Sequence, residues 1–269
     1  MEYSKKEDVV FKISTDKNKF ILTPFSDVHF DSKKCERELL KKHIEETIDK
    51  GAYIYFNGDF LDVMGADRDP RSGKGDIRPE YDVPNYLDVV VEDAIKFLKP
   101  YKSKILFMSD GNHETNILRR QETNVLNRIA GALGIARMGY SGWIKIDFTG
   151  KNKDFKLIHF HHGFGGGAQR TKGVLRVDID AAKYPDADIV MRGHDHQKWY
   201  INFKRRRFCH IENDMYKSEQ LHLQLGSYKD GYGRGTKGWE VEKEFSDTPL
   251  GTWEITMKPN AKPSVRDLS

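Results

Sequence analysis

The sequence predicts an α/β fold, because short apolar runs typical of buried strands alternate with longer stretches of helical periodicity. Apolar residues make up 38% of the 269 positions and charged residues 32%, a balance that is typical of a folded chain and excludes a disordered one. No Gly-, Ser- or Pro-rich linker divides the sequence. We therefore expect a single domain over residues 1–269.

The first half of the chain supplies most of the predicted helices. Apolar runs at 9–14 and 20–26, joined by a polar turn at 15–19, predict a hairpin. A helix is expected after Ser32, where apolar residues recur at every fourth position until Gly51 ends the pattern. The other elements expected in this half are strands at 53–57 and 104–109 and helices at 86–98 and 117–134.

Strand signals dominate from Trp143 onward. The runs at 143–148 and 155–161, joined by a polar turn, predict a second hairpin. The loop at 64–83 has no apolar periodicity, and loops of that length are usually functional. We expect it to be a lid or a contact between the subunits of a homo-oligomer. Later strands are expected at 189–192, 199–203, 221–225 and 252–257.

Hydropathy and cysteine content exclude several classes of protein. The longest apolar runs, such as 104–108, are far shorter than the roughly 20 residues of a membrane-spanning helix. The charged segment 1–10 leads into no hydrophobic stretch, which argues against a secretory signal, so we expect a cytoplasmic protein without membrane contact. Cys35 and Cys209 are too few for a disulfide framework or a thiolate zinc site.

The charge of the chain points to no partner class by itself. The formal net charge is +4, from 45 Lys and Arg residues against 41 Asp and Glu residues. The densest basic run is Lys204-Arg205-Arg206-Arg207. Two interpretations of this run stay open: a solvated hairpin tip, or a contact with a polyanion such as nucleic acid.

Polar side chains follow five of the predicted strands at the point where each strand ends. Because ligands of open α/β sheets gather outside the carboxyl ends of the strands, we expect these groups in one crevice. Oxygen and imidazole donors without thiolates suit Mn, Fe, Zn or Ni, and their number exceeds what one ion needs, which predicts two divalent ions. The five groups are Asp27-Val28-His29, Gly58-Asp59-Phe60-Leu61-Asp62, Gly111-Asn112-His113-Glu114, His161-His162-Gly163 and Gly193-His194-Asp195-His196.

Each of these residues, taken alone, has an ordinary structural role. Asp27 would cap the following segment, and Asn112 would form an Asx turn. Such separate roles do not account for five polar groups at five strand ends. The joint pattern therefore favours the metal centre.

This ordered set of motifs resembles the calcineurin-like metallophosphoesterase family, over about residues 20 to 200. The family's blocks read DxH, GDxxD, GNH followed by an acid, His before Gly, and GHxH. The HHG block with its following glycine run, and a late Gly/Tyr segment, are similar to phage-type members. The resemblance implies a four-layer sandwich of two mixed β-sheets flanked by helices.

The resemblance also implies a ligand for each position of the metal centre. Asp27, His29 and His196 would hold one ion, Asn112, His162 and His194 the other, and Asp59 would bridge both. Because side chains alternate along a strand, His161 and His162 point to opposite faces. The family's ligand stands immediately before a glycine, which selects His162 and leaves His161 as the alternative.

Other histidines and acids receive supporting roles. His113 would protonate the leaving oxygen, and Asp62 would orient His113, with a helix N-cap as the alternative role of Asp62. Glu114 would brace its loop, and Asp195 would support a ligand histidine. The histidines outside the motifs are expected on the surface at position 43 and in structural roles at 159, 210 and 222.

Through this resemblance we expect hydrolysis of a phosphoester by a hydroxide that two ions, about 3.5 to 4 Å apart, generate between them. The glycine loop 165–170 would hold a phosphate through its amides and Arg170. The Gly/Tyr segment 226–235 would fold over the site, with a tyrosine stacked on a base. We favour a Mn-dependent phosphodiesterase of nucleotides or nucleic acid. The alternatives are a phosphomonoesterase or protein phosphatase, and a non-catalytic scaffold of the same fold.

Overall fold

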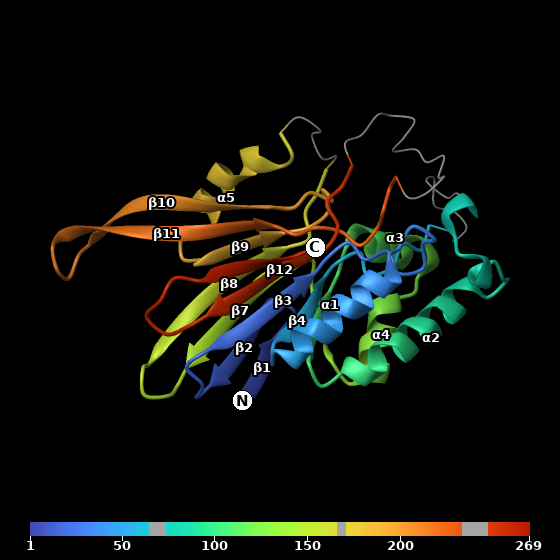
Figure 1. The fold of residues 1–269 in the computed structure, drawn as a ribbon, viewed down its shortest axis with the longest axis horizontal. Coiled ribbons are helices and arrows are strands. Elements are labelled where there is room, and N and C mark those ends of the chain that lie inside the picture. Colours follow the sequence, from blue (N-terminus) through green and yellow to red (C-terminus); the bar gives the residue numbers. More distant parts are fainter. Residues whose placement is uncertain (65–73, 166–170, 233–246) are drawn as a thin grey trace.

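The computed structural model describes residues 1–64, 74–165, 171–232 and 247–269. Its described residues form two β-sheets that pack face to face, with helices on the outer side of each sheet (Figure 1). The predicted four-layer α/β sandwich of two mixed sheets is thereby confirmed. The first sheet has the order β1 (Glu2–Lys6), β2 (Val10–Thr15), β7 (Ser141–Phe148), β8 (Asp154–His161), β9 (Ile189–Arg192), β11 (Asp214–Gln224) and β10 (Trp199–Cys209).

The second sheet carries most of the helices. Parallel pairing joins β3, β4, β5 and β6, and β12 continues the sheet in antiparallel direction. Its order is β13 (Ser264–Leu268), β12 (Thr252–Met257), β3 (Phe20–Phe25), β4 (Tyr53–Asn57), β5 (Ile105–Ser109) and β6 (Ala136–Met138). The helices are α1 (Arg37–Asp49), α2 (Tyr86–Leu98), α3 (Asn112–Gln121), α4 (Val125–Leu133) and α5 (Val177–Lys183), with short 3-10 turns at Lys74–Asp76, Pro79–Tyr81, Lys99–Tyr101 and Val174–Arg176.

Two apolar cores hold the layers together. Between the sheets, Tyr55, Phe107 and Phe160 are fully buried and their rings contact one another. Outside the second sheet, the apolar faces of α1, α2 and α4 cover a separate core that includes Leu40 and Val90. Each such side chain contributes about 1.5 to 3 kcal/mol through its removal from water.

The predicted hairpin over residues 9–26 is wrong. β2 pairs with β1 and β7, whereas β3 pairs with β4 and β12, so the turn at 15–19 crosses from one sheet to the other. The local pattern of two apolar runs and a polar turn is the same in both arrangements. Only the partner strands, which are distant in sequence, distinguish a hairpin from a crossover.

Other predicted elements needed smaller corrections. The helix expected at 117–134 is two helices, separated by Glu122 with a left-handed φ of 54°. Glu36, not Ser32, precedes α1. β1 and α5 were not expected, and β10 and β11 are longer than the strands predicted there. Among the described helices, none has the length and apolar character needed to span a bilayer.

Candidate metal centre

The two sheets bring their strand ends together at one edge of the sandwich. β3, β4 and β5 run parallel and end just before Asp27, Asp59 and Asn112. In the other sheet, β8 and β9 run parallel and end just before His162 and His194. Because parallel strands share a direction, the side chains that follow them converge, as the sequence predicted.

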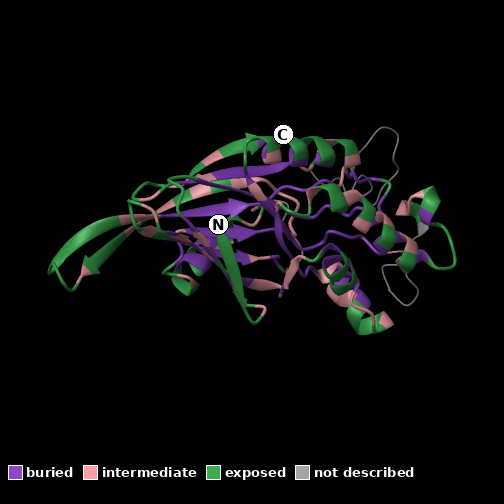
Figure 2. Cartoon of the chain, turned by 90° about the horizontal axis from the view of Figure 1, so that it is seen from below, coloured by how far each residue is buried: buried purple, intermediate pink, exposed green. Residues whose placement is uncertain are grey.

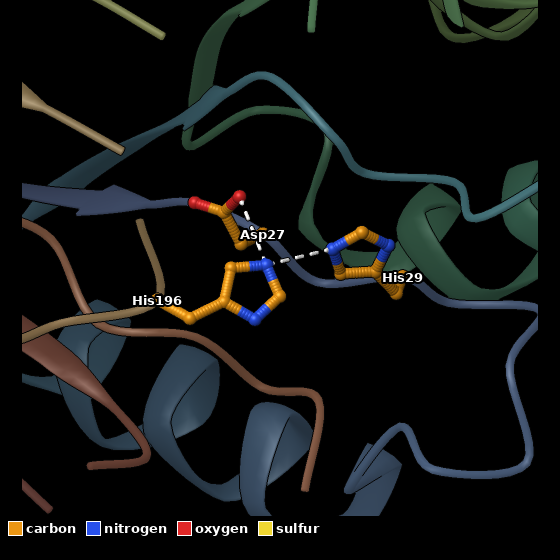
Figure 3. A group of neighbouring side chains, drawn as sticks. All are labelled: Asp27, His29 and His196. Atoms are coloured by element: carbon orange, nitrogen blue, oxygen red, sulfur yellow. Dashed lines mark hydrogen bonds and ion pairs between the residues drawn. The ribbon is translucent and has the colours of Figure 1, made fainter. Parts of the chain in front are cut away.

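Asp27, His29 and His196 form the first group of metal-ligating atoms (Figure 3). Nε2 of His196 lies 3.2 Å from Nε2 of His29 and 3.4 Å from Oδ1 of Asp27. Atoms that bind one ion at about 2.0 to 2.2 Å lie roughly 3 to 3.5 Å apart, so these separations fit a shared ion. Oδ1 of Asp27 is buried and has no hydrogen-bond partner among the described residues, as expected of an atom reserved for a cation.

The second group comprises Asp59, His162 and His194, with Asn112 between the two histidines. Nε2 of His162 lies 3.1 Å from Oδ2 of Asp59 and 3.2 Å from Oδ1 of Asn112. Nδ1 of His194 lies 2.8 Å from the same Asn112 oxygen. The groups are adjacent, because Nε2 of His162 is 4.0 Å from Oδ1 of Asp27.

Each of three candidate ligand histidines places one ring nitrogen close to an oxygen atom outside its group of donor atoms. Nδ1 of His29 meets the Asp62 carboxylate at 2.7 Å, and Nδ1 of His162 meets the Asn57 carbonyl at 2.8 Å. Nε2 of His194 meets the Gly165 carbonyl at 2.5 Å. Because a nitrogen that faces an oxygen acceptor carries the ring's N–H, the other nitrogen of the neutral ring keeps its lone pair for a metal.

Five of the candidate ligands have an unusual backbone. Such left-handed φ angles cost energy outside glycine, and they persist where function requires a particular side-chain direction. The φ angles are 52° for Asp27, 50° for His29, 50° for Asp59, 72° for His194 and 50° for His196.

Glycines in the motifs leave room for the ligands. A Cβ atom at Gly111 would collide with the Asp59 side chain, and one at Gly193 would collide with Ser26 and Asp27. Gly58 has a φ of 82°, and a Cβ there would collide with His162. Any larger residue at these positions would therefore displace a ligand.

Two buried carboxylates hold the ligand loops in place. Glu114 accepts hydrogen bonds from the main-chain N–H groups of Asp59 at 3.1 Å, Leu61 at 3.0 Å and Gly111 at 3.1 Å, which confirms its bracing role. Asp31 accepts from the N–H groups of Asp62 at 2.6 Å and Val63 at 2.9 Å. Asp31 lies outside every sequence motif and was not predicted as a site residue.

The carboxylate of Asp62 has closer partners than His113, the ring that it was expected to orient. It contacts Nδ1 of His29 at 2.7 Å and Nζ of Lys229 at 2.8 Å. His113 instead meets the main-chain carbonyl of Asp62 through Nδ1 at 2.5 Å, and its distance to the carboxylate is 3.8 Å. Within the described residues no helix begins at Asp62, so the alternative role as a helix cap is wrong. Lys229 was not singled out as a site residue.

The charges of the two groups are strongly coupled. Burial would raise the pKa of Asp27, but His162 and His196 outweigh burial and lower it to about 2. Burial also opposes the charge of His162, yet Asp59 and Asp27 raise the pKa of His162 to about 10. Its buried imidazolium thus balances two carboxylates. A divalent cation can take over this role, with release of the proton.

The remaining predicted residues lie as follows. His161 belongs to neither group of donor atoms and accepts a hydrogen bond from the N–H of Gly163 at 2.8 Å. Asp195 approaches Arg176 at 3.8 Å, and no hydrogen bond from it to a ligand histidine is among the described contacts. Arg170 lies outside the described residues, as does the Gly/Tyr segment beyond Tyr232.

The described part of the late Gly/Tyr segment does fold back over the site. Oγ of Ser227 donates to the main-chain carbonyl of Asp27 at 2.8 Å. Tyr228, however, is fully buried, and its hydroxyl contacts Nδ1 of His43 at 2.9 Å. Tyr228 is therefore not exposed for stacking on a base, and His43, which was expected on the surface, is buried with it.

Comparisons with known proteins agree with this geometry. The sequence profile of the family described as calcineurin-like phosphoesterase matches residues 23–198. No curated protein matches the chain.

Solved structures with low sequence identity are also similar to this chain. A predicted phosphoesterase from Streptococcus pneumoniae has 13% identity, a TM-score of 0.36, and coverage of 90% of this chain and 85% of that chain. A metallophosphoesterase from Sphaerobacter thermophilus has 14% identity, a TM-score of 0.36, and coverage of 91% and 86%. GAP50, the anchor in the inner membrane complex of Plasmodium, has 12% identity, a TM-score of 0.42, and coverage of 93% and 84%.

Proposed function

Because this chain belongs to the calcineurin-like phosphoesterase family, and is therefore a metal-dependent hydrolase of phosphoester bonds, we propose that it uses two divalent ions to hydrolyse phosphodiesters of nucleotides or nucleic acid. The observation that carries the proposal is the pair of adjacent donor groups, joined by the 4.0 Å approach of His162 to Asp27. We further propose that a single domain covers residues 1–269. We also propose that the ions are Mn and that the protein acts in the cytoplasm.

One ion would be held by Asp27, His29 and His196. The other would be held by Asn112, His162 and His194, since Oδ1 of Asn112 lies 3.2 Å from Nε2 of His162 and 2.8 Å from Nδ1 of His194. Asp59 would serve both ions, because a carboxylate offers two oxygens. When bound, two such ions activate a water molecule and neutralise charge on the phosphoryl group.

His113 acts as the general acid that delivers a proton to the leaving oxygen. Its Nδ1 must donate to the Asp62 carbonyl, because a carbonyl oxygen only accepts. A transferable proton on Nε2 therefore requires the doubly protonated ring. Oδ2 of the Asp59 carboxylate lies 3.8 Å from Nε2. The side chain of His113 is 11% exposed, which leaves it reachable from the crevice.

The phosphodiester assignment rests on the similarity of the HHG block and the late Gly/Tyr segment to phage-type members. A phosphomonoesterase or protein phosphatase is the alternative, because the same two ions serve either ester. A non-catalytic scaffold is disfavoured, since all predicted ligands are present at the site.

The test is a direct comparison of two substrates. Rates on a bis-aryl phosphodiester and on an aryl phosphomonoester are measured side by side in Mn, with metal content determined on the same sample. Faster turnover of the diester supports the proposal, and faster turnover of the monoester favours the alternative. Absence of both activities in protein that holds two ions favours the scaffold.

A further inference from the structure

The hairpin of β10 and β11 extends beyond its neighbours in the first sheet (Figure 1). Its two strands pair from Trp199 opposite Gln224 to Cys209 opposite Asp214. Within the described residues, β9 pairs with β11 only from Leu221 onward. Residues 204–219 therefore project from the body and are largely exposed (Figure 2). We call these residues the arm.

One face of the arm gathers cations and apolar side chains. Opposite residues of an antiparallel pair share a face, and every second residue along a strand returns to it. Lys204, Arg206 and Phe208 of β10 therefore share a face with Met215 and Lys217 of β11. All five are exposed, with Phe208 at 50% and Met215 at 69%. We call these five residues the cationic face.

Among the described residues, Glu219 is the acid that shares this face, opposite Lys204, and it offsets only part of the positive charge. Arg206 lies directly opposite Lys217, and like charges in that position destabilise a strand pair. Among the described residues, Lys204, Arg206 and Lys217 form no ion pair. The carboxylate of Glu219, which lies opposite Lys204, is bound by Lys262 at 2.7 Å.

Acidic residues near the tip do not neutralise the cationic face. Asp214 lies opposite Cys209, and this pair points to the other face of the arm. Glu212 lies in the turn. A hollow of about 310 Å³ is lined by Lys204, Arg205, Arg206, Lys217, Ser218 and Glu219. Four of these six residues are cations, and their positive charge complements the negative charge of a phosphate group.

We propose that the cationic face binds a single-stranded nucleic acid, with its phosphates on Lys204, Arg206 and Lys217 and a base stacked on Phe208. An exposed aromatic ring beside a row of cations is the combination that binds unpaired strands. This inference rests on the proposed function, because it names nucleic acid as the polymer whose diesters reach the metal centre.

The distance between arm and metal centre sets the length of the substrate. β10 is an edge strand that begins at Trp199, three residues after His196. Arg206 lies seven residues further along, about 23 Å away at 3.3 Å per residue. A strand that stays stacked, with the roughly 3.4 Å rise that it has in a duplex, needs about seven nucleotides to cover that distance, and an extended single strand needs fewer. Shorter diesters reach the metal centre alone.

The binding test compares two triple variants that remove equal charge. Lys204→Gln/Arg206→Gln/Lys217→Gln alters the cationic face, and Lys41→Gln/Lys96→Gln/Lys102→Gln removes three exposed lysines from the helical side as the control. Affinity for a 20-nucleotide single strand is measured in EDTA, which prevents cleavage, over a range of salt concentration.

With three phosphate contacts, the slope of log affinity against log salt should flatten by about two units in the arm variant. The control variant should keep the wild-type slope. Phe208→Ala should weaken binding about tenfold without changing the slope. Superimposed curves for the wild type and the arm variant would overturn the proposal. So would wild-type binding to phosphatidylserine vesicles in the absence of any binding to the oligonucleotide.

Cleavage in Mn separates this inference from the proposed function. For the 20-nucleotide substrate, the arm variant should show a raised KM and an unchanged kcat, while its turnover of a dinucleotide should equal that of the wild type. Equal KM values for the long substrate would contradict the inference. A wild type that binds the strand in EDTA but cleaves neither substrate would refute the proposed function and leave the arm as a binding surface.

Discussion

The carboxylate of Asp62 lies 2.7 Å from Nδ1 of His29, a candidate metal ligand, and 3.8 Å from Nδ1 of His113. Both side chains are almost fully buried, at 3% and 1% exposure. A carboxylate behind a ligand histidine fixes the ring and strengthens its free nitrogen as a donor. Lys229, at 2.8 Å from the same carboxylate oxygen, keeps Asp62 ionised for this role.

Asp62→Asn should therefore weaken metal binding, by about 10-fold to 100-fold, because the amide removes the charge that supports His29. Isothermal titration with Mn measures the affinity directly. His113→Ala serves as the control, since His113 is not a proposed ligand. Unchanged metal affinity in Asp62→Asn, together with lost turnover, would instead show that Asp62 acts by orienting His113.

The fourth motif yields a paired prediction. His162→Ala should abolish binding at one of the two sites and reduce turnover to background, because Nε2 of His162 faces both Asp59 and Asn112. His161→Ala should keep both ions, since that ring bonds to its own loop. Metal content by elemental analysis distinguishes the two variants. Loss of an ion from the His161 variant alone would reverse the assignment.

The general-acid role of His113 predicts a dependence on the leaving group. His113→Ala should cost about 10²-fold to 10⁴-fold in turnover of a diester with a poor leaving group. A nitrophenolate leaving group needs little protonation, so the loss there should be much smaller. Rates on both substrates in metal-loaded protein provide the comparison. Equal losses would show that His113 only positions or stabilises charge.

Stability at acidic pH should depend on His222, which lies away from the metal centre and contacts Gln220 at 2.9 Å. Burial lowers the pKa of His222 from 6.5 to about 4. The unfolded chain therefore takes up the proton first as the pH falls. The free energy of unfolding should decrease by up to about 1.4 kcal/mol per pH unit between these two pKa values.

Urea unfolding of His222→Gln in EDTA at pH 7, 6 and 5 isolates this contribution. The variant should be less stable at pH 7 and should lose stability with falling pH more gradually than the wild type. Parallel pH profiles for the two proteins would exclude His222 as a source of the acid sensitivity.

Local sequence patterns were sufficient to predict features that depend on a single helix or strand. The strand Tyr53–Asn57 and the helix Tyr86–Leu98 were predicted with their observed bounds, because apolar periodicity and flanking turn residues mark both. The strand-end motifs likewise predicted which residues converge on the crevice. Strand alternation placed His161 and His162 on opposite faces, and the family resemblance selected His162, which lies among the grouped donor atoms.

Contacts between residues far apart in sequence were not predictable in this way. His43 was expected on the surface, yet it is buried against Tyr228, 185 positions away. Asp31 belongs to no motif, and Lys229 received no role within the Gly/Tyr segment. Only the folded chain brings Lys229 to Asp62 and Asp31 to the main chain of Asp62 and Val63. The crossover between β2 and β3 was missed for the same reason, since each strand finds its partners elsewhere.

The two-ion centre is tested most directly by a crystal structure of the protein soaked in excess Mn, with the ions located by anomalous scattering. We expect two ions per chain. One should be bound by Asp27, His29 and His196 and the other by Asn112, His162 and His194, with Asp59 in contact with both. A single ion, or an Asp59 carboxylate that touches only one of two ions, would contradict it.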